Sequence, residues 1–101
     1  MTAELSIRGG TVYDGTGTEG RRADVAITEG VITEIGADLK GERELDASGC
    51  AVTPGFIDIH THYDAQVFWD PHLRPSSYHG VTTVVAGNCG FAIAPTRREH
   101  H

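Results

Sequence analysis

The residues best suited to chemistry are two histidines one position apart, His60 and His62, at the end of an apolar run that follows Pro54-Gly55. In an extended strand, alternate side chains share a face, so both imidazoles would project from one side, about 7 Å apart along the strand. Asp58 would lie on the same face and could hydrogen-bond the second ring nitrogen of a ligating histidine. Two imidazoles on one rigid strand can hold a metal ion, and the pattern therefore indicates metal-dependent hydrolysis.

A cysteine, Cys89, follows the strongest strand pattern in the chain, the β-branched run over residues 81–86. It lies in a glycine-rich loop, where a thiolate could bind zinc, although a free cysteine is more often a small buried side chain. His62 and Cys89 thus lie where consecutive predicted strands finish. In a barrel of parallel strands, active sites are built at that end. Asp64, two positions after His62, would either orient a ligand or cap a turn.

The other potentially reactive side chains have simpler interpretations. Arg74 and Tyr78 lie in the irregular stretch over residues 63–80 and could line a substrate pocket. We assign no chemical role to the remaining histidines or to the second cysteine, which are His72, His79, His100, His101 and Cys50.

Composition excludes several classes of protein. The 101 residues are 39% hydrophobic and 22% charged, which is typical of a folded chain, and the net charge of −6 argues against nucleic-acid binding. No apolar run approaches the roughly 20 residues of a membrane span, and the N-terminus lacks a signal-peptide pattern. We therefore expect a cytoplasmic location with both cysteines reduced, a Cys50–Cys89 disulfide being the alternative.

The elements that must position these residues fall into two unlike parts, residues 1–53 and 54–101. The first part holds ten of the fourteen acidic residues and no histidine, whereas the second holds all six histidines. Alternating patterns in the first part predict short antiparallel strands, with a turn at Gly9-Gly10 and a hairpin turn at residues 28–31. The second part predicts strands over 56–62 and 81–86, with a short helix around 64–68.

The segment Gly15 to Gly20 matches the G-x-G-x-x-G pattern of dinucleotide-binding loops. That reading requires a helix to begin immediately afterwards. Residues 23–27 instead alternate as a strand does, which favours a flexible loop between two strands and no nucleotide cofactor.

Two stretches resemble known enzymes. Asp46 to Gly49, followed by residues 52–62, resembles the opening of the amidohydrolase superfamily. Residues 60–64 and 80–90, and most specifically Gly87-Asn88-Cys89-Gly90, resemble the N-acyl-D-amino-acid deacylases (D-aminoacylases). The resemblance implies a mainly β fragment, in which residues 1–53 are the N-terminal portion of a small β-sandwich and residues 54–101 begin a (β/α)₈ barrel with its strands 1 and 2.

The same resemblance implies a function. His60, His62 and Cys89 match metal ligands, Asp58 and Asp64 would support them, and Zn²⁺ would be the cofactor for hydrolysis of small-molecule N-acyl-D-amino acids. The remaining ligands and the catalytic aspartate come from later strands of such a barrel, which needs about 250 residues. We therefore expect no catalytic residue within this chain, which alone would be inactive and prone to self-association.

Two alternatives remain open from the sequence. The chain could be a piece of a hydantoinase- or dihydropyrimidinase-like cyclic amidohydrolase, which would share the histidine pair. It could also be a non-catalytic β-rich module that binds a metal or a partner.

Overall fold

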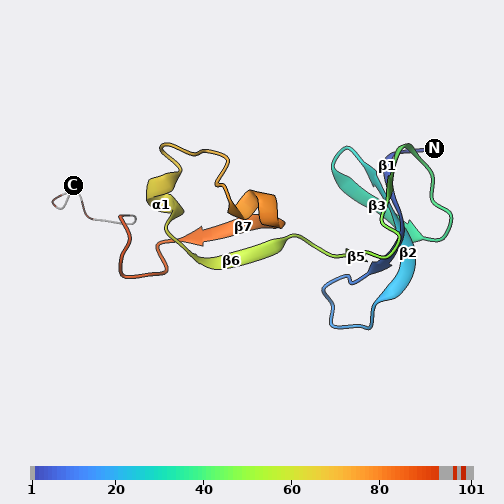
Figure 1. Ribbon diagram of the computed structural model, residues 1–101, viewed down its shortest axis with the longest axis horizontal. Coiled ribbons are helices and arrows are strands. Elements are labelled where there is room, and N and C mark those ends of the chain that lie inside the picture. The colour runs from blue at the N-terminus through green and yellow to red at the C-terminus, as the bar shows by residue number, and fades with distance from the viewer. Residues whose placement is uncertain (1, 94–96, 98, 100–101) are drawn as a thin grey trace. The chain divides into compact units, whose positions relative to one another are not determined.

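The computed structural model describes residues 2–93, 97 and 99 (Figure 1). The chain divides into two compact units, Met1–Pro54 and Gly55–His101. Strands make up most of the regular structure in both, so the mainly β prediction is confirmed. His100 and His101 lie outside the described residues.

The first unit is one five-stranded sheet, formed by β1 (Ala3–Val12), β2 (Arg21–Thr28), β3 (Val31–Gly36), β4 (Gly41–Asp46) and β5 (Ala51–Val52). The strand order is β3-β2-β1-β4, and β5 also pairs with β1. The β1–β2 and β2–β3 pairs are antiparallel, as predicted, and residues 29–30 form the turn of the hairpin. The prediction was wrong for β4 and β5, which run parallel to β1. Because β3 and β4 lie at opposite edges, residues 37–40 must cross the sheet between them.

Gly9 and Gly10, predicted as a turn, lie instead inside the continuous strand β1. The register with β2 passes from Ile7↔Val25 to Gly10↔Ala23, which leaves one extra residue on β1. Gly9 adopts a left-handed φ of 75° and donates its N–H to Asp24 Oδ1 at 2.8 Å. The glycines therefore form a β-bulge, the feature in which such backbone conformations are used within a strand.

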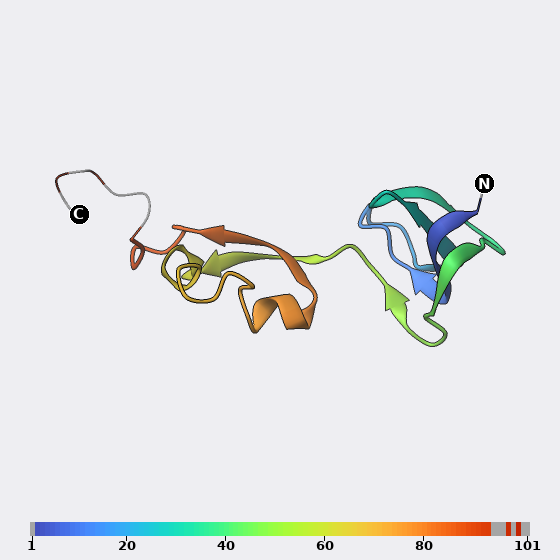
Figure 2. The ribbon, with the colours of Figure 1, turned by 90° about the horizontal axis from the view of Figure 1, so that it is seen from above.

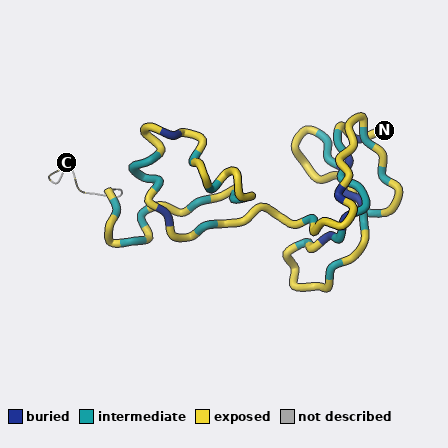
Figure 3. Tube along the Cα trace, in the orientation of Figure 1, coloured by how far each residue is buried: buried dark blue, intermediate teal, exposed yellow. Residues whose placement is uncertain are grey.

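The apolar core described by the structure belongs to the first unit. Small and medium-sized side chains fill it: Ala3, Val12, Val25, Ala26 and Ala47. Figure 3 colours buried positions dark blue, and those of the first unit lie in β1, in β2 and in the segment after β4.

The second unit is built on two parallel strands, β6 (Phe56–Thr61) and β7 (Val81–Ala86). Two single-turn helices separate them in sequence, α1 (Tyr63–Gln66) and the 3₁₀ helix η1 (Ser76–His79). Figures 1 and 2 show both arrows side by side and pointing the same way, with α1 beyond the end of β6. A helix was predicted around residues 64–68, and the observed helix begins one residue earlier and ends two residues earlier. The predicted strand over 56–62 ends one residue short.

Gly55 sets the start of this strand pair. A Cβ atom at Gly55 would collide with the side chain of Thr82 on the neighbouring strand. The next residue, Phe56, donates its N–H to the carbonyl oxygen of Gly80 at 2.9 Å. Only glycine allows the backbone at the start of β6 to lie this close to the start of β7.

The predicted loop between two strands is confirmed, because residues 15–20 lead directly into β2 and not into a helix. The Asp14 carboxylate accepts hydrogen bonds from Thr16 and forms an ion pair with Arg21. These contacts hold the pKa of Asp14 well below its usual range. Within the described residues, no helix has the length and apolar character needed to span a membrane.

Candidate metal centre

The parallel pairing of β6 and β7 brings the three predicted ligands together. Parallel strands end at the same edge, so residues that follow β7 lie near the end of β6. One potential ligand atom from each of His60, His62 and Cys89 lies within 4.8 Å of the other two. Both histidines are exposed and Cys89 is half-buried. The two imidazole centroids are 5.8 Å apart, with their planes inclined by 52°.

His62 reaches this cluster from a position the sequence pattern did not predict. The strand ends at Thr61, and His62 is the residue that precedes helix α1, with φ −112° and ψ 30°. The histidines are therefore not simply alternate residues of one strand. A change of backbone direction between them turns the second imidazole toward the loop that carries Cys89.

A β-bulge lies beside the first histidine. The β6–β7 register passes from Asp58↔Val84 to Thr61↔Ala86, so Ile59 and His60 lie opposite Val85 alone. The Asp58 carboxylate accepts the backbone N–H of His60 at 3.1 Å. The sequence led us to expect a bond from Asp58 to a ring nitrogen; the bond described by the structure supports the backbone that carries the ring.

The tautomer of His62 follows from its hydrogen bond. Its Nδ1 lies 2.9 Å from the carbonyl oxygen of Phe91. Because a carbonyl oxygen only accepts, Nδ1 must carry the proton and donate it. In the neutral ring, Nε2 then keeps the lone pair that a metal ion requires. This contact was not predicted, since a backbone carbonyl leaves no trace in the residue type.

Asp64 takes part in the same local structure. It lies in the first turn of α1, and its Oδ2 accepts the backbone N–H of Ile93 at 2.6 Å. The bond ties the segment after Cys89 to the helix after His62. The bond joins residues far apart in the sequence and is therefore not a local cap, and the segment that it holds also carries the Phe91 carbonyl.

The donor set suits zinc in both chemistry and spacing. Zinc prefers thiolate and imidazole ligands in a tetrahedral arrangement, in which donor atoms lie about 3.3–3.7 Å apart. The separations of up to 4.8 Å therefore require a contraction of roughly 1 Å, within reach of side-chain rotation. Three protein donors also leave a fourth tetrahedral position for water or substrate.

The remaining candidates behave as structural or surface residues. Cys50 is exposed, and both cysteines are free thiols in the structure. Arg74 donates to Asp70 at 3.1 Å, and Tyr78 is 75% exposed. Neither lines the hollow of about 210 Å³ between residues 71–77 and β7, where His72 is found instead. His79 Nδ1 lies 2.9 Å from the Pro75 carbonyl oxygen.

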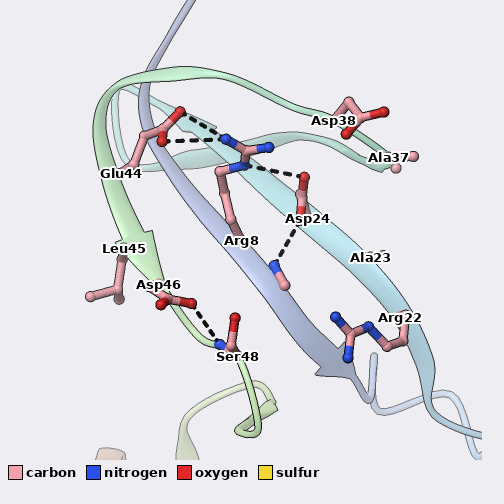
Figure 4. A pocket seen from close by; sticks show the side chains of 12 residues that line it. Arg8, Arg22, Ala23, Asp24, Ala37, Asp38, Glu44, Leu45, Asp46 and Ser48 are labelled. Carbon is pink, nitrogen blue, oxygen red and sulfur yellow. Dashed lines mark hydrogen bonds and ion pairs between the residues drawn. The ribbon is translucent and has the colours of Figure 1, made fainter.

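A hollow of about 560 Å³ in the first unit contains none of the candidate ligands. Figure 4 shows Arg8 between two carboxylates there, with Glu44 at 3.3 Å and Asp24 at 3.6 Å. The hydrogen bond and charge of Glu44 raise the pKa of Arg8. Arg8 on β1 thus pairs with acidic residues of both neighbouring strands, Asp24 on β2 and Glu44 on β4, and these ion pairs help to hold the sheet together.

Comparisons with known proteins identify the family of the chain. The amidohydrolase family matches residues 43–100, more than half of the chain. The D-aminoacylase of Alcaligenes xylosoxydans xylosoxydans is 45% identical over 91% of this chain. The N-acyl-D-glutamate deacylase of Bordetella bronchiseptica, solved with zinc and a phosphonate inhibitor, superposes over 95% of this chain with a TM-score of 0.83 and 43% identity. The D-hydantoinase of Bacillus sp. AR9 is 45% identical but covers 57% of this chain, with a TM-score of 0.51.

The chain belongs to the amidohydrolase family. It is similar to D-aminoacylases and related deacylases over nearly its whole length, and to the hydantoinase over little more than half. It spans 19% of the Alcaligenes D-aminoacylase, 21% of the Bordetella deacylase and 13% of the hydantoinase.

Proposed function

We propose that His60, His62 and Cys89 are ligands of a zinc ion in an amidohydrolase that hydrolyses N-acyl-D-amino acids. The convergence of two imidazoles and a thiol at one end of a parallel strand pair carries this proposal. It is further supported by the zinc named for the Bordetella deacylase, which is 43% identical. The protonated Nδ1 of His62 is consistent with ligation through Nε2.

The chemistry follows from the difficulty of the reaction. An amide carbon resists attack by neutral water, and a zinc ion held by these residues would supply a nucleophile near neutral pH and would polarise the carbonyl. The residues of this chain bind and orient: the two histidines and Cys89 hold the ion, and Asp58 and Asp64 fix the backbone segments that carry those ligands. The products would be a carboxylate and a free D-amino acid. We assign proton transfer to residues outside this chain.

The two units have separate proposed roles. Residues 1–53 would be the N-terminal portion of a small β-sandwich, and residues 54–101 would supply strands 1 and 2 of a (β/α)₈ barrel. The parallel β6–β7 pair, connected through α1 and η1, suits the second assignment because parallel strands need such crossover connections. Ligands at the C-terminal ends of both strands also suit a barrel active site.

Zinc binding is the direct test. We expect the full chain to bind one Zn²⁺ ion with Cys89 as a ligand, measured by competition with a chromogenic chelator. Cys89→Ala should weaken binding at least 100-fold, because it removes the strongest of three ligands. Cys50→Ala is the matched control and should bind as the parent does. Equal affinity in the parent and in Cys89→Ala would contradict the ligand assignment.

Substrate class requires a separate assay on an enzyme that contains this chain together with the rest of the barrel. We expect release of free D-amino acid from N-acetyl-D-amino acids, detected with a D-amino acid oxidase coupled assay, and little turnover of the L-enantiomers or of hydantoins. Efficient ring opening of a hydantoin would instead favour the cyclic amidohydrolase alternative.

A further inference from the structure

The ladder between β6 and β7 is interrupted at the position where the candidate ligands lie. Two residues, Ile59 and His60, stand opposite the single residue Val85. A bulge of this kind bends its strand and breaks the regular series of main-chain bonds. The carbonyl groups beside it need other donors, and the distance between the two strands is no longer set by the ladder alone.

Two side chains supply those donors, in opposite directions across the bulge. The hydroxyl of Thr61, at the end of β6, donates to the carbonyl oxygen of Val85 on β7 at 2.9 Å. The amide of Asn88, after β7, donates to the carbonyl oxygen of Ile59 on β6 at 2.8 Å. Since the acceptor is a carbonyl, the nitrogen of the Asn88 amide must be the atom that faces it.

These donors are the immediate sequence neighbours of the candidate ligands. Thr61 lies between His60 and His62, and Asn88 directly precedes Cys89. Thr61 is 7% exposed, so its hydroxyl bond is largely shielded from competing water. Gly87, the residue before Asn88, has a left-handed φ of 78°. This conformation turns the chain as it leaves β7 and lets the Asn88 side chain reach back to β6.

We propose that Thr61 and Asn88 are positioning residues of the metal centre, whose two opposed hydrogen bonds set the separation between the histidines and Cys89. This inference rests on the proposed metal site, because it assigns a purpose to the bonds only if those three residues bind an ion together. Neither side chain is among the proposed ligands. Their effect is to hold the donor atoms close to the tetrahedral spacing before the ion binds.

Cobalt(II) binding to the full chain tests this inference without an activity assay. In a Cys50→Ser background, the thiolate-to-cobalt charge-transfer band reports only an ion bound to Cys89. Thr61→Val and Asn88→Ala should each weaken cobalt affinity about tenfold, the lower end of the effect seen when groups that orient metal ligands are lost. Thr61→Ser keeps the hydroxyl and should restore most of the affinity. Thr83→Val, which removes an exposed hydroxyl from the same strand pair, should leave it unchanged.

The outcomes separate this inference from the proposed function. A parent chain without the charge-transfer band would overturn the metal centre itself, and the positioning role with it. A parent with the band, together with unchanged affinity in Thr61→Val and Asn88→Ala, would overturn the positioning role alone. Equal losses in these variants and in Thr83→Val would also overturn it, because they would indicate general weakening of the sheet. Asn88 is exposed, so Asn88→Ala tests the proposal even if the buried Thr61→Val variant fails to fold.

Discussion

The two units of this chain are stabilised in different ways. In the first, five apolar residues are buried between and beside the strands of one sheet. In the second unit, the buried residues among those that the structure describes are Thr61 and Asp70, and both are polar. Burial would raise the pKa of Asp70, but hydrogen bonds from Arg74 and His72 and the charge of Arg74 outweigh it and lower that pKa.

The contrast extends to the exposed surface of β6. Phe56, Ile57 and Ile59 are each more than 60% exposed, although parallel sheets are normally covered on both faces. The second unit thus carries the candidate chemistry on a strand pair with little core of its own. Stability and site are divided between the units, and the following predictions test that division.

Zinc should stabilise the second unit and leave the first unchanged. At a zinc concentration 100 times the dissociation constant, the free energy of opening in β6 and β7 should rise by about 2.7 kcal/mol. Hydrogen exchange followed by mass spectrometry measures both units in one experiment. The gain should vanish in Cys89→Ala, and equal protection of β1 and β2 would contradict the division.

Truncation of an apolar side chain should destabilise the first unit much more than the second. Val25 is 4% exposed, and Val25→Ala should lower the free energy of unfolding of the first unit by about 2 kcal/mol. Ile57 is 64% exposed, and Ile57→Ala should change stability by less than about 0.5 kcal/mol. Guanidinium denaturation followed by far-ultraviolet circular dichroism measures the first loss, while the fluorescence of Trp69 reports the second unit. A loss in Ile57→Ala as large as that in Val25→Ala would show that β6 is already packed.

The exposed strand pair should promote association between copies of the chain. Unpaired strand edges and apolar side chains favour pairing, so sedimentation should show a mass that rises with concentration. Ile57→Lys should weaken this association about tenfold, since it removes one aliphatic side chain that association would bury. Ile32→Lys changes a comparably exposed residue of the first unit and is the matched control. A larger effect of Ile32→Lys would move the associating surface to the other unit.

The smallest predicted effect depends on pH and belongs to the first unit. Asp24 accepts the N–H groups of Gly9 and Leu39, and these bonds with the nearby charge of Arg8 lower its pKa despite burial. A lowered pKa means that the carboxylate stabilises the fold above its unfolded pKa of about 3.9 and loses that contribution as the pH falls through the folded value.

Asp24→Asn should therefore cost about 1 kcal/mol at pH 7, and the difference from the parent should shrink below about pH 4. Urea denaturation over a pH series measures it. Asp38→Asn, an exposed neighbour in the same hollow, is the control and should show little change. A constant difference between Asp24→Asn and the parent at every pH would mean that the charge of Asp24 does not contribute.

Some of these features could be predicted from residue patterns and others could not. Alternation and β-branching located β6 and β7, because both depend on local side-chain periodicity. The parallel position of β4 and β5 depends on how residues 37–40 cross the sheet, which no local pattern records. The bulge at Gly9 was mistaken for a turn because glycine allows a left-handed backbone in both.

The candidate ligands could be identified by residue type, but their support could not. Histidine and cysteine are recognisable as metal ligands from the sequence. The group that fixes the His62 tautomer is the backbone carbonyl of Phe91, and every residue type has such a carbonyl. Thr61 and Asn88 could have been noticed from their positions beside the ligands. Their purpose depends on the bulge, which requires the register of both strands to be known.

Gly55 has a consequence for how the second strand pair begins. Because the Thr82 side chain occupies the space where a Cβ would lie, a slide of β6 by one residue would force Pro54 or Phe56 into that space. The glycine therefore fixes the register at the start of the strand pair. The register then shifts twice before β6 ends, between Phe56 and Ile57 and between Asp58 and Thr61. A residue that carries no side chain thus fixes one end of the strand pair, while the end that carries the candidate ligands is free to adopt a register of its own.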